Sequence, residues 1–540
     1  MLPMSETCRY KFLFFDDHDL LEIRGLNRRI GQVVKHPEPV LKLNAPWDTN
    51  PMEMFNYNNV LYDEREKLFR MWYSVIGQRP DEYWERGRKT AVATSTDGIH
   101  WERPILDMVE VNGSTENNYI LGEMLSCSYT IIDDPSDAPC RRYKMIFQVE
   151  SEESRWARYH MPLCLATSAD GISWNRPVHV NPVLRGISDA GWGFIYDQDQ
   201  RIYRLYTRRV PNVPRDISLY ESVDLVNWED RGRILVPGDE IDPPEMFNFQ
   251  GMTPFFYEGF CLGLLNTQYS LPEGETYEVF QAPPEGFPAD RLGHVDVQLA
   301  FSRDGRVWSR PDDRSPIVPV GAPGDPDEGV IFVPSANPFT IDGDTWIYYT
   351  AVRYQHNDRT QRAYMQKHDH DMREAVSCML AKMPEDHWMC LDGTGTEGFL
   401  MHKPWGPPHE IFVNADAAGG SIEAELVTPY GQVIADHGRA DCIPVTADGK
   451  DQPLRWKHGR SPWLEIAKDH RGGILVRLYV KNAKLYSYTL TLPDPDGQLL
   501  QDKLNARWCD HIKHRSGNWD RDSNAPAQGV PTISNKRSWT

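Results

Sequence analysis

Short apolar segments separated by acidic turns recur along residues 46–397. Each unit begins with an apolar segment, passes through a turn that contains an acidic residue, and returns as a segment rich in aromatic residues. Short runs of this composition are typical of β-strands. Five such pairs lie at residues 59–73, 129–147, 194–206, 253–265 and 337–349. Four of these first turns contain an aspartate that we expect to form the turn and not to act in catalysis: Asp63, Asp134, Asp197 and Asp342.

A second repeat follows three of the pairs. The pattern Ser-x-Asp-Gly-x-x-Trp-x-Arg-Pro begins at Ser95, Ser168 and Ser302, and a degenerate copy begins at Ser222. Asp-Gly supplies the positive φ angles of a tight hairpin, and Ser and Asp side chains bind backbone N–H groups in such turns. We therefore interpret the repeat as part of the scaffold, joining the third and fourth strands of each unit.

Five units of four strands predict an all-β fold, a five-bladed β-propeller over residues 46–397. The fifth unit has no clear Asp-Gly copy, and we expect its outer strands within residues 377–380 and 388–391. Residues 1–45 are expected to close or flank the propeller, with the apolar segment 11–15 as the candidate for closing the ring.

Residues 398–500 change character. Segments such as 421–426, 473–479 and 484–490 alternate apolar and polar residues with the period of a half-buried strand. Turn signals divide them, which predicts a C-terminal β-sandwich. The tail 501–540 is polar and without periodicity. An exposed edge of the sandwich would permit a homo-oligomer.

Charge and cysteine content exclude several classes of function. The formal net charge is −20, which disfavours nucleic acid and anionic membranes as partners. The first residues do not resemble a secretion signal, and no apolar run is long enough to span a membrane. The nine cysteines are scattered without zinc spacing, so we expect a cytoplasmic protein with reduced thiols and neither metal nor cofactor. The His368-Asp-His370-Asp segment is interpreted as a solvated loop.

Propeller geometry ranks the candidate chemistry. In each blade the start of the first strand and the end of the second strand lie at the same face, around a central channel. The sequence Glu-Met-Phe-Asn followed by an aromatic residue occurs twice, and it gives Glu53 and Glu245 like positions before the first and fourth inner strands. Both acids are therefore expected at this face.

Cleavage of a glycosidic bond requires two carboxyl groups, one as an acid and one as a nucleophile or base. We select Glu245 as the general acid and Glu53 as the nucleophile or base, with Asp189 as a third catalytic candidate. The residues expected to bind substrate are eight further polar groups at this face: Asp48, Tyr73, Gln148, Arg208, Asp242, Gln268, Asp327 and Arg353.

The Asp-Gly hairpins, the aspartate turns and the trailing sandwich together resemble the five-bladed glycosidases of families 32, 43 and 68 over about residues 10–500. The resemblance implies catalytic acids at the starts of the inner strands of the early blades. The chain differs from these families because it lacks a Trp-Met-Asn-Asp-Pro-Asn motif, an Arg-Asp-Pro and a Glu-Cys. Asp48, beside Trp47, is the nearest counterpart to the first motif.

The leading hypothesis is a glycoside hydrolase that acts on an oligosaccharide or glycoside, furanosides included. Three alternatives stay open. A glycoside phosphorylase would hold phosphate with Arg208, Arg209 or Arg353. A non-catalytic propeller would bind carbohydrate only. A lyase would use Tyr and His as bases.

Overall fold

A computed structural model describes residues 7–48, 53–77, 89–122, 129–148, 161–177, 179–187, 193–208, 215–238, 241, 247–269, 293–333, 337–356, 358–404, 408–458 and 473–493. Of the residues that the structure describes, 53% are in strands and 4% in helices, which confirms the predicted all-β fold class. It forms two compact units: unit 1 comprises Met1–Gln32, Glu258–Phe260 and Glu385–Thr540, and unit 2 comprises Val33–Tyr257 and Cys261–Pro384. Among the described residues, no helix has the length and apolarity to cross a membrane.

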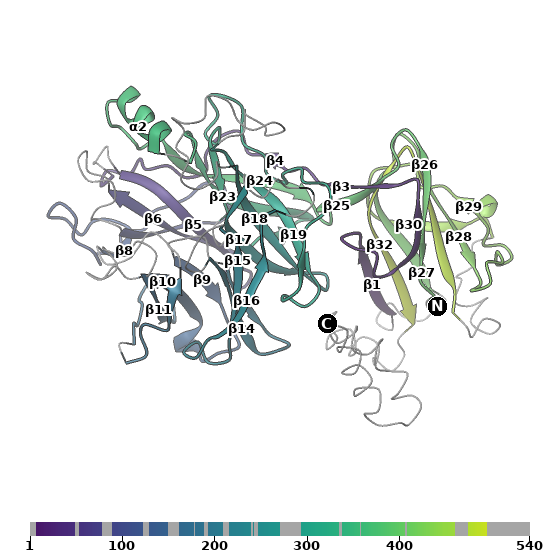
Figure 1. Cartoon of the computed structure of the whole chain (residues 1–540), viewed down its shortest axis with the longest axis horizontal. Helices are drawn as coiled ribbons and strands as arrows, with labels where there is room; N and C mark the ends of the chain where they lie inside the picture. Colours follow the sequence, from purple (N-terminus) through teal and green to yellow (C-terminus); the bar gives the residue numbers. More distant parts are fainter. Residues whose placement is uncertain are drawn as a thin grey trace. The chain divides into compact units, whose positions relative to one another are not determined.

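Unit 2 contains three four-stranded sheets in which each strand pairs antiparallel with the next one in the chain (Figure 1). The first sheet consists of β5 (Glu53–Asp63), β6 (Leu68–Gly77), β7 (Lys89–Ser95) and β8 (Tyr119–Leu121). The second consists of β9 (Tyr129–Asp133), β10 (Tyr143–Gln148), β11 (Met161–Ser168) and β12 (Leu184–Ile187). The third consists of β13 (Gly193–Asp197), β14 (Ile202–Thr207), β15 (Ile217–Ser222) and β16 (Glu229–Leu235).

The rest of unit 2 is a nine-stranded sheet. One half contains β17 (Phe247–Tyr257), β18 (Phe260–Tyr269), β19 (Val295–Ser302) and β20 (Trp308–Ser309). The other half contains β21 (Val330–Phe332), β22 (Phe339–Ile341), β23 (Asp344–Val352), β24 (Val376–Pro384) and β4 (Val34–Lys35). A single parallel pair, Val295 opposite Val330, joins the halves. We interpret them as blades four and five, and the count of five blades stays a prediction.

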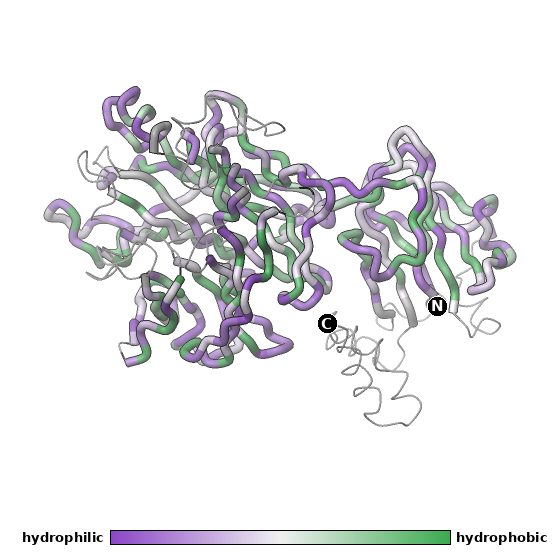
Figure 2. Tube along the Cα trace, in the orientation of Figure 1, coloured by the Kyte–Doolittle hydropathy of each residue, from purple (hydrophilic) through white to green (hydrophobic). Residues whose placement is uncertain are grey.

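Side-chain hydrogen bonds connect the sheets of unit 2 in a cyclic order. Each bond joins one of the five groups of strands to the next, and the last joins the fifth group back to the first. The donor–acceptor pairs are Trp72 Nε1 to Gly171 O (2.7 Å), Tyr203 OH to Asp134 Oδ2 (2.7 Å), Tyr206 OH to Gly305 O (2.7 Å), Val333 N to Asn266 Oδ1 (3.1 Å) and Tyr348 OH to Gly98 O (2.6 Å). This order is the one that a closed propeller requires. Figure 2 shows apolar residues along the strands and hydrophilic residues in many of the turns.

The Asp-Gly repeats form nearly identical turns. In the first copy, Ser95 Oγ accepts the Gly98 N–H at 2.8 Å, and Asp97 Oδ1 accepts the next two N–H groups at 2.8 Å. The same bonds recur in the copies that begin at Ser168 and Ser302. In the degenerate copy, Leu225 adopts the left-handed conformation with φ 68°. The interpretation of the repeat as scaffold agrees with these contacts.

Gly171→Ala is expected to lower the free energy of unfolding by about 2–4 kcal/mol. Gly171 has φ +73°, where a side chain costs roughly 1–2 kcal/mol, and an added Cβ would lie 2.7 Å from the buried Trp72 ring. Gly113→Ala is the control, because Gly113 has φ +79° but no atom within 4 Å of an added Cβ. Urea unfolding of both variants separates the conformational cost from the packing cost. Equal losses in the two variants would contradict the proposed importance of the Trp72 contact.

Unit 1 is a β-sandwich. Its larger sheet has seven strands: β29 (Cys442–Ile443), β30 (Gly449–Trp456), β27 (Glu410–Asp416), β32 (Lys484–Pro493), β25 (Met389–Asp392), β3 (Asn27–Ile30) and β1 (Thr7–Leu13). Its smaller sheet has four: β2 (Leu20–Arg24), β26 (Glu397–His402), β31 (Leu475–Lys481) and β28 (Ser421–Val427). Side chains of both sheets, including Val413 and Leu478, form one buried core. The predicted sandwich is therefore present.

Two predicted strand assignments are wrong. Segment 11–15 does not close the propeller, because β1 pairs with β32 and Phe12 and Phe14 pack into the sandwich core. Segment 388–391 is not an outer strand of blade five, because β25 pairs with β3 and β32. The predicted division at residues 45 and 397 differs from the observed units for the same reason. The N-terminal strand that pairs with blade five is β4, where Lys35 lies opposite Ala381.

Candidate active site

The strand register identifies the end of unit 2 where the predicted site lies. Glu53, the first residue of β5, is opposite Gly77, the last residue of β6. Val330, the first residue of β21, is likewise opposite Val352, the last residue of β23. The turns that contain the predicted turn aspartates lie at the other end of these strand pairs. In the turn between β5 and β6, Asp63 Oδ1 accepts a hydrogen bond from the N–H of Arg65 at 2.9 Å. We refer to the end with Glu53 and Val330 as the axial face.

The catalytic candidates lie at or beyond the edge of the described residues. Glu53 begins β5. Asp189, Asp242 and Glu245 lie outside the described residues. In the sequence, Asp189 precedes β13 and Glu245 precedes β17, so the connections that hold them lead to inner strands. Their roles stay predictions.

A buried chain of polar side chains joins blades three and four at the axial face. Arg208, which follows β14, donates from Nη1 to Gln250 Oε1 at 3.0 Å. Gln250 donates from Nε2 to Gln268 Oε1, and Gln268 donates to the carbonyl oxygen of His356 at 3.3 Å. All three side chains are at most 8% exposed. The structure thus brings together two predicted residues, Arg208 and Gln268, which are distant in sequence.

Gln250 was not predicted, although the sequence contains a signal for it. It follows Glu245 at the same distance at which Asn58 follows Glu53 in the repeated Glu-Met-Phe-Asn segment. Both residues lie on inner strands and are buried, and Asn58 Oδ1 accepts a hydrogen bond from Thr350 Oγ1 at 2.9 Å. The repeat therefore marks a second pair of equivalent polar positions.

Two predicted substrate-binding residues of blade one are engaged in internal bonds. Asp48 is 4% exposed and accepts the Ala45 N–H at 2.8 Å and the Tyr119 hydroxyl at 3.0 Å. Tyr73 is 1% exposed, and its hydroxyl accepts a hydrogen bond from Asn118 at 2.8 Å. Burial raises the pKa of Tyr73, which keeps its phenol neutral. These bonds favour a supporting role for both residues.

Two predicted substrate-binding residues of blade five are likewise engaged in internal bonds. Asp327 is buried, forms an ion pair with Lys35 at 2.5 Å and accepts the Tyr349 hydroxyl at 2.9 Å. It thereby connects β4 to the rest of the blade. Arg353 donates to the carbonyl oxygens of Glu374 at 3.0 Å and Gly324 at 2.8 Å. Gln148 is the remaining substrate-binding candidate among the described residues, and it is fully buried at the end of β10.

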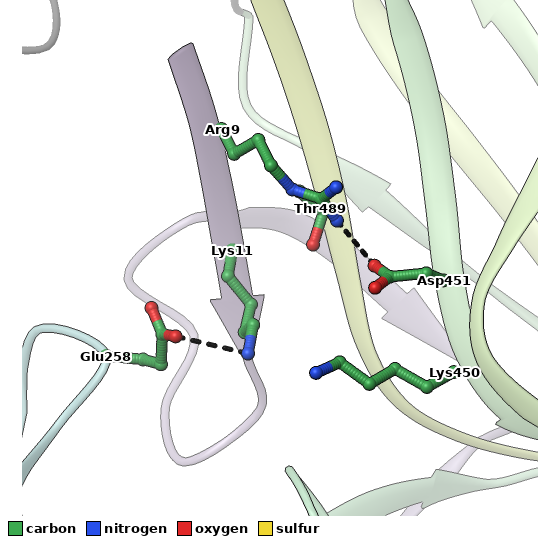
Figure 3. A pocket seen from close by; sticks show the side chains of 6 residues that line it. All are labelled: Arg9, Lys11, Glu258, Lys450, Asp451 and Thr489. Atoms are coloured by element: carbon green, nitrogen blue, oxygen red, sulfur yellow. Dashed lines mark hydrogen bonds and ion pairs between the residues drawn. The ribbon is translucent and has the colours of Figure 1, made fainter. Parts of the chain in front are cut away.

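A separate cleft of about 300 Å³ in unit 1 is lined by six residues: Arg9, Lys11, Glu258, Lys450, Asp451 and Thr489 (Figure 3). Its cations are paired with acids, since Arg9 lies 2.5 Å from Asp451 and Lys11 lies 3.1 Å from Glu258. Burial acts to lower the pKa of Lys11, but Asp386 and Glu258 outweigh it and hold the pKa above its usual value. We assign none of the predicted chemistry to this cleft.

No group of three or more His, Cys, Asp or Glu side chains within the described ranges is arranged to hold a metal ion. His368 and His370 are exposed, and the His368 ring stacks on Tyr364 with centroids 4.1 Å apart.

No protein-family model matches the chain, and no curated protein matches it. Several solved structures are similar at low identity. A glycosyl hydrolase from Bacteroides ovatus is 13% identical, covers 65% of this chain and 94% of its own, and has a TM-score of 0.42. A structure described under the GH130 family of mannoside phosphorylases, which contains glycoside hydrolases, is 13% identical, covers 65% of this chain and 94% of its own, and has a TM-score of 0.40. A GH32 β-fructofuranosidase from Bombyx mori is 13% identical, covers 85% of this chain and 94% of its own, and has a TM-score of 0.38.

Proposed function

We propose that the chain is a glycoside hydrolase whose reaction takes place at the axial face of unit 2. One observation carries the proposal: the buried chain of Arg208, Gln250 and Gln268 lies at this face, where β5 begins at Glu53. Amide and guanidinium groups donate hydrogen bonds that suit the hydroxyls of a sugar. The substrate class is an oligosaccharide or glycoside, and furanosides are included.

In the proposed mechanism, Glu245 donates a proton to the leaving glycosidic oxygen while Glu53 acts on the anomeric carbon, directly or through water. A separation of about 5–5.5 Å between the two carboxyl groups would give retention of configuration, and roughly 6.5–9.5 Å would give inversion. Asp189 is proposed as a third acid at the same opening. Arg208, Gln250 and Gln268 are proposed to hold the sugar in place, because their mutual bonds fix their orientation. A side-chain amide has two N–H groups, and the bonds described for Gln250 and Gln268 each use one of them, so the second N–H is proposed to donate to a sugar hydroxyl.

Asp48, Tyr73, Asp327 and Arg353 are retained in the proposal only as groups that support the walls of the opening, because their described contacts are internal, and Gln148 is retained in the same way because it is fully buried. Asp242 stays a proposed substrate contact. The protein is proposed to require no cofactor and to act on carbohydrate as its partner. A homo-oligomer and a cytoplasmic location stay predictions.

A phosphorolytic reaction is the second candidate, and the buried guanidinium of Arg208 is the observation that favours it. Arginine is suited to hold phosphate in two parallel hydrogen bonds. In this reaction phosphate replaces water as the group that attacks the anomeric carbon.

A screen of aryl glycosides and of gluco-, manno-, fructo- and arabino-oligosaccharides, with and without 10 mM phosphate, tests both reactions; this concentration is on the order of a saturating one for typical enzymes. We expect turnover without phosphate and a free reducing sugar as product. Turnover that depends on phosphate would replace the hydrolase with the phosphorylase. Binding without any product would favour a non-catalytic carbohydrate-binding protein, and an unsaturated product would indicate a lyase.

A further inference from the structure

The connection between β23 and β24 extends from the axial face of blade five. It leaves β23 at Val352 and enters β24 at Val376, and it contains the helix α2 (Asp358–Lys367). Because Val352 is opposite Val330, the start of β21, the connection begins where the inner strand of the same blade begins. Figure 1 shows α2 projecting at the edge of the strands of unit 2.

The first part of this connection is fixed to blade four. The His356 N–H donates to Gly293 O at 2.7 Å, and the His356 carbonyl accepts the bond from Gln268. The His356 ring also packs edge-on against Phe332 of β21, with centroids 5.8 Å apart. The connection is thus tied directly to the buried polar chain that includes Arg208.

Beyond this anchor, three rings form a continuous aromatic series. Tyr354 lies 5.8 Å from Tyr364, and Tyr364 stacks on His368 at 4.1 Å with an angle of 19° between the rings. Gln361 Nε2 donates to the Tyr354 hydroxyl at 3.2 Å, which joins α2 to the strand end. The series runs from the half-buried Tyr354 to the exposed His368.

Charged residues act on the middle ring of this series. Burial raises the pKa of Tyr364, the positive charge of Arg353 acts to lower it, and the negative charges of Glu374, Glu328 and Asp371 act to raise it. Glu328 lies two residues before the start of β21 and is therefore near the axial face of the same blade. Flat rings with carboxylate groups nearby are suited to the apolar face and the hydroxyls of a sugar ring.

We propose that the α2 connection forms a second saccharide subsite beside the axial opening, with the stacked Tyr364–His368 pair as its platform. It rests on the proposed function, and it binds a sugar unit distant from the bond that is cleaved. The subsite would therefore make the enzyme prefer oligosaccharides to single glycosides. A plain structural alternative is that the pair only stabilises the end of α2, since residues four apart on a helix are neighbours.

The test compares His368→Ala, Tyr364→Ala and the exposed control Lys367→Ala. KM is measured for an aryl monoglycoside and for oligosaccharides of two to five units from a series that the wild-type chain hydrolyses. We expect His368→Ala and Tyr364→Ala to raise KM for the longer oligosaccharides by about three- to tenfold, because an aromatic pair contributes that range of affinity. Their kcat and their KM for the monoglycoside should stay within about twofold of wild type.

If all three variants have the KM of the wild type at every chain length, and the wild-type chain hydrolyses the substrates, the subsite proposal is overturned and the glycosidase proposal stands. Lower thermal stability without a length-dependent change in KM would establish the plain structural alternative. If the wild-type chain hydrolyses none of the substrates, the proposed function fails. Calorimetric titration with the oligosaccharides of the substrate screen then decides the subsite. Binding that His368→Ala weakens supports the subsite, whereas absence of binding by the wild type, or binding that His368→Ala leaves unchanged, overturns it.

Discussion

Glu53→Gln and Glu245→Gln are each expected to lower kcat by about 10²–10⁴-fold, the range that a positioned acid or base contributes. Glutamine has the shape of glutamate but cannot donate a carboxylic proton or act as a carboxylate nucleophile. The free energy of unfolding should change by less than about 0.5 kcal/mol, as is usual for substitutions outside the core. Steady-state kinetics on the best substrate of the screen, together with urea unfolding, measures both effects.

The two variants should differ with the leaving group. A dinitrophenolate leaves without protonation, so Glu245→Gln is expected to recover much of its activity on a dinitrophenyl glycoside, whereas Glu53→Gln is not. Glu66→Gln is the matched control, because Glu66 lies in the turn at the far end of β5 and β6 and is 56% exposed. Activity retained in both single variants would rule out this catalytic pair. Recovery in Glu53→Gln alone would reverse the two roles.

Arg204→Met is expected to lower the free energy of unfolding by about 3–5 kcal/mol, because removing one partner of a buried ion pair leaves an uncompensated charge. Arg204 is fully buried on β14 and bonds Asp197 Oδ2 at 2.7 Å and Glu221 Oε1 at 2.9 Å. Both carboxylates are at most 1% exposed. Burial acts to raise the pKa of Glu221, but its bonds to Arg306 and Arg204 outweigh burial and lower it.

Arg231→Met provides the comparison for this buried network. Arg231 bonds the same carboxylate, with Nε 2.7 Å from Glu221 Oε2, but its side chain is 37% exposed. Exposed ion pairs contribute about 0–1 kcal/mol, so the loss should be small. The midpoint of urea unfolding, followed by tryptophan fluorescence, measures both variants. Losses of similar size would show that burial does not set the cost of this substitution.

Local turn chemistry made much of unit 2 predictable. Asp-Gly at a fixed spacing requires a tight hairpin, and Gly98, Gly171 and Gly305 all have the positive φ that this requires. The pairing partners of isolated strands were harder to predict. The apolar character of segment 11–15 correctly indicates a strand over its first residues, but short apolar strands occur in sandwiches and in propellers alike. Only the contacts of Phe12 with distant residues such as Tyr488 determine the sheet to which it belongs.

The candidate site was predictable to a smaller extent. Residue type and position along a strand placed Arg208 and Gln268 at the same face, and both lie in one buried chain. The same criteria also selected Asp48 and Asp327, whose carboxylates bind Tyr119 and Lys35. Sequence position does not reveal these partners, because they come from strands far along the chain. Such contacts determine whether an acid can face a substrate or instead binds other side chains within the fold.

The domain order has a consequence for biosynthesis. Unit 2 is an insertion within unit 1, since strands β1–β3 precede it and β25–β32 follow it. As the chain leaves the ribosome, β1 cannot pair until its partner β32 has been synthesised. By that time all strands of the inserted unit have been synthesised. A fragment limited to residues 398–500 lacks β1, β2, β3 and β25, and it would expose the unpaired edge of β32. Productive expression of the sandwich therefore requires both ends of the polypeptide.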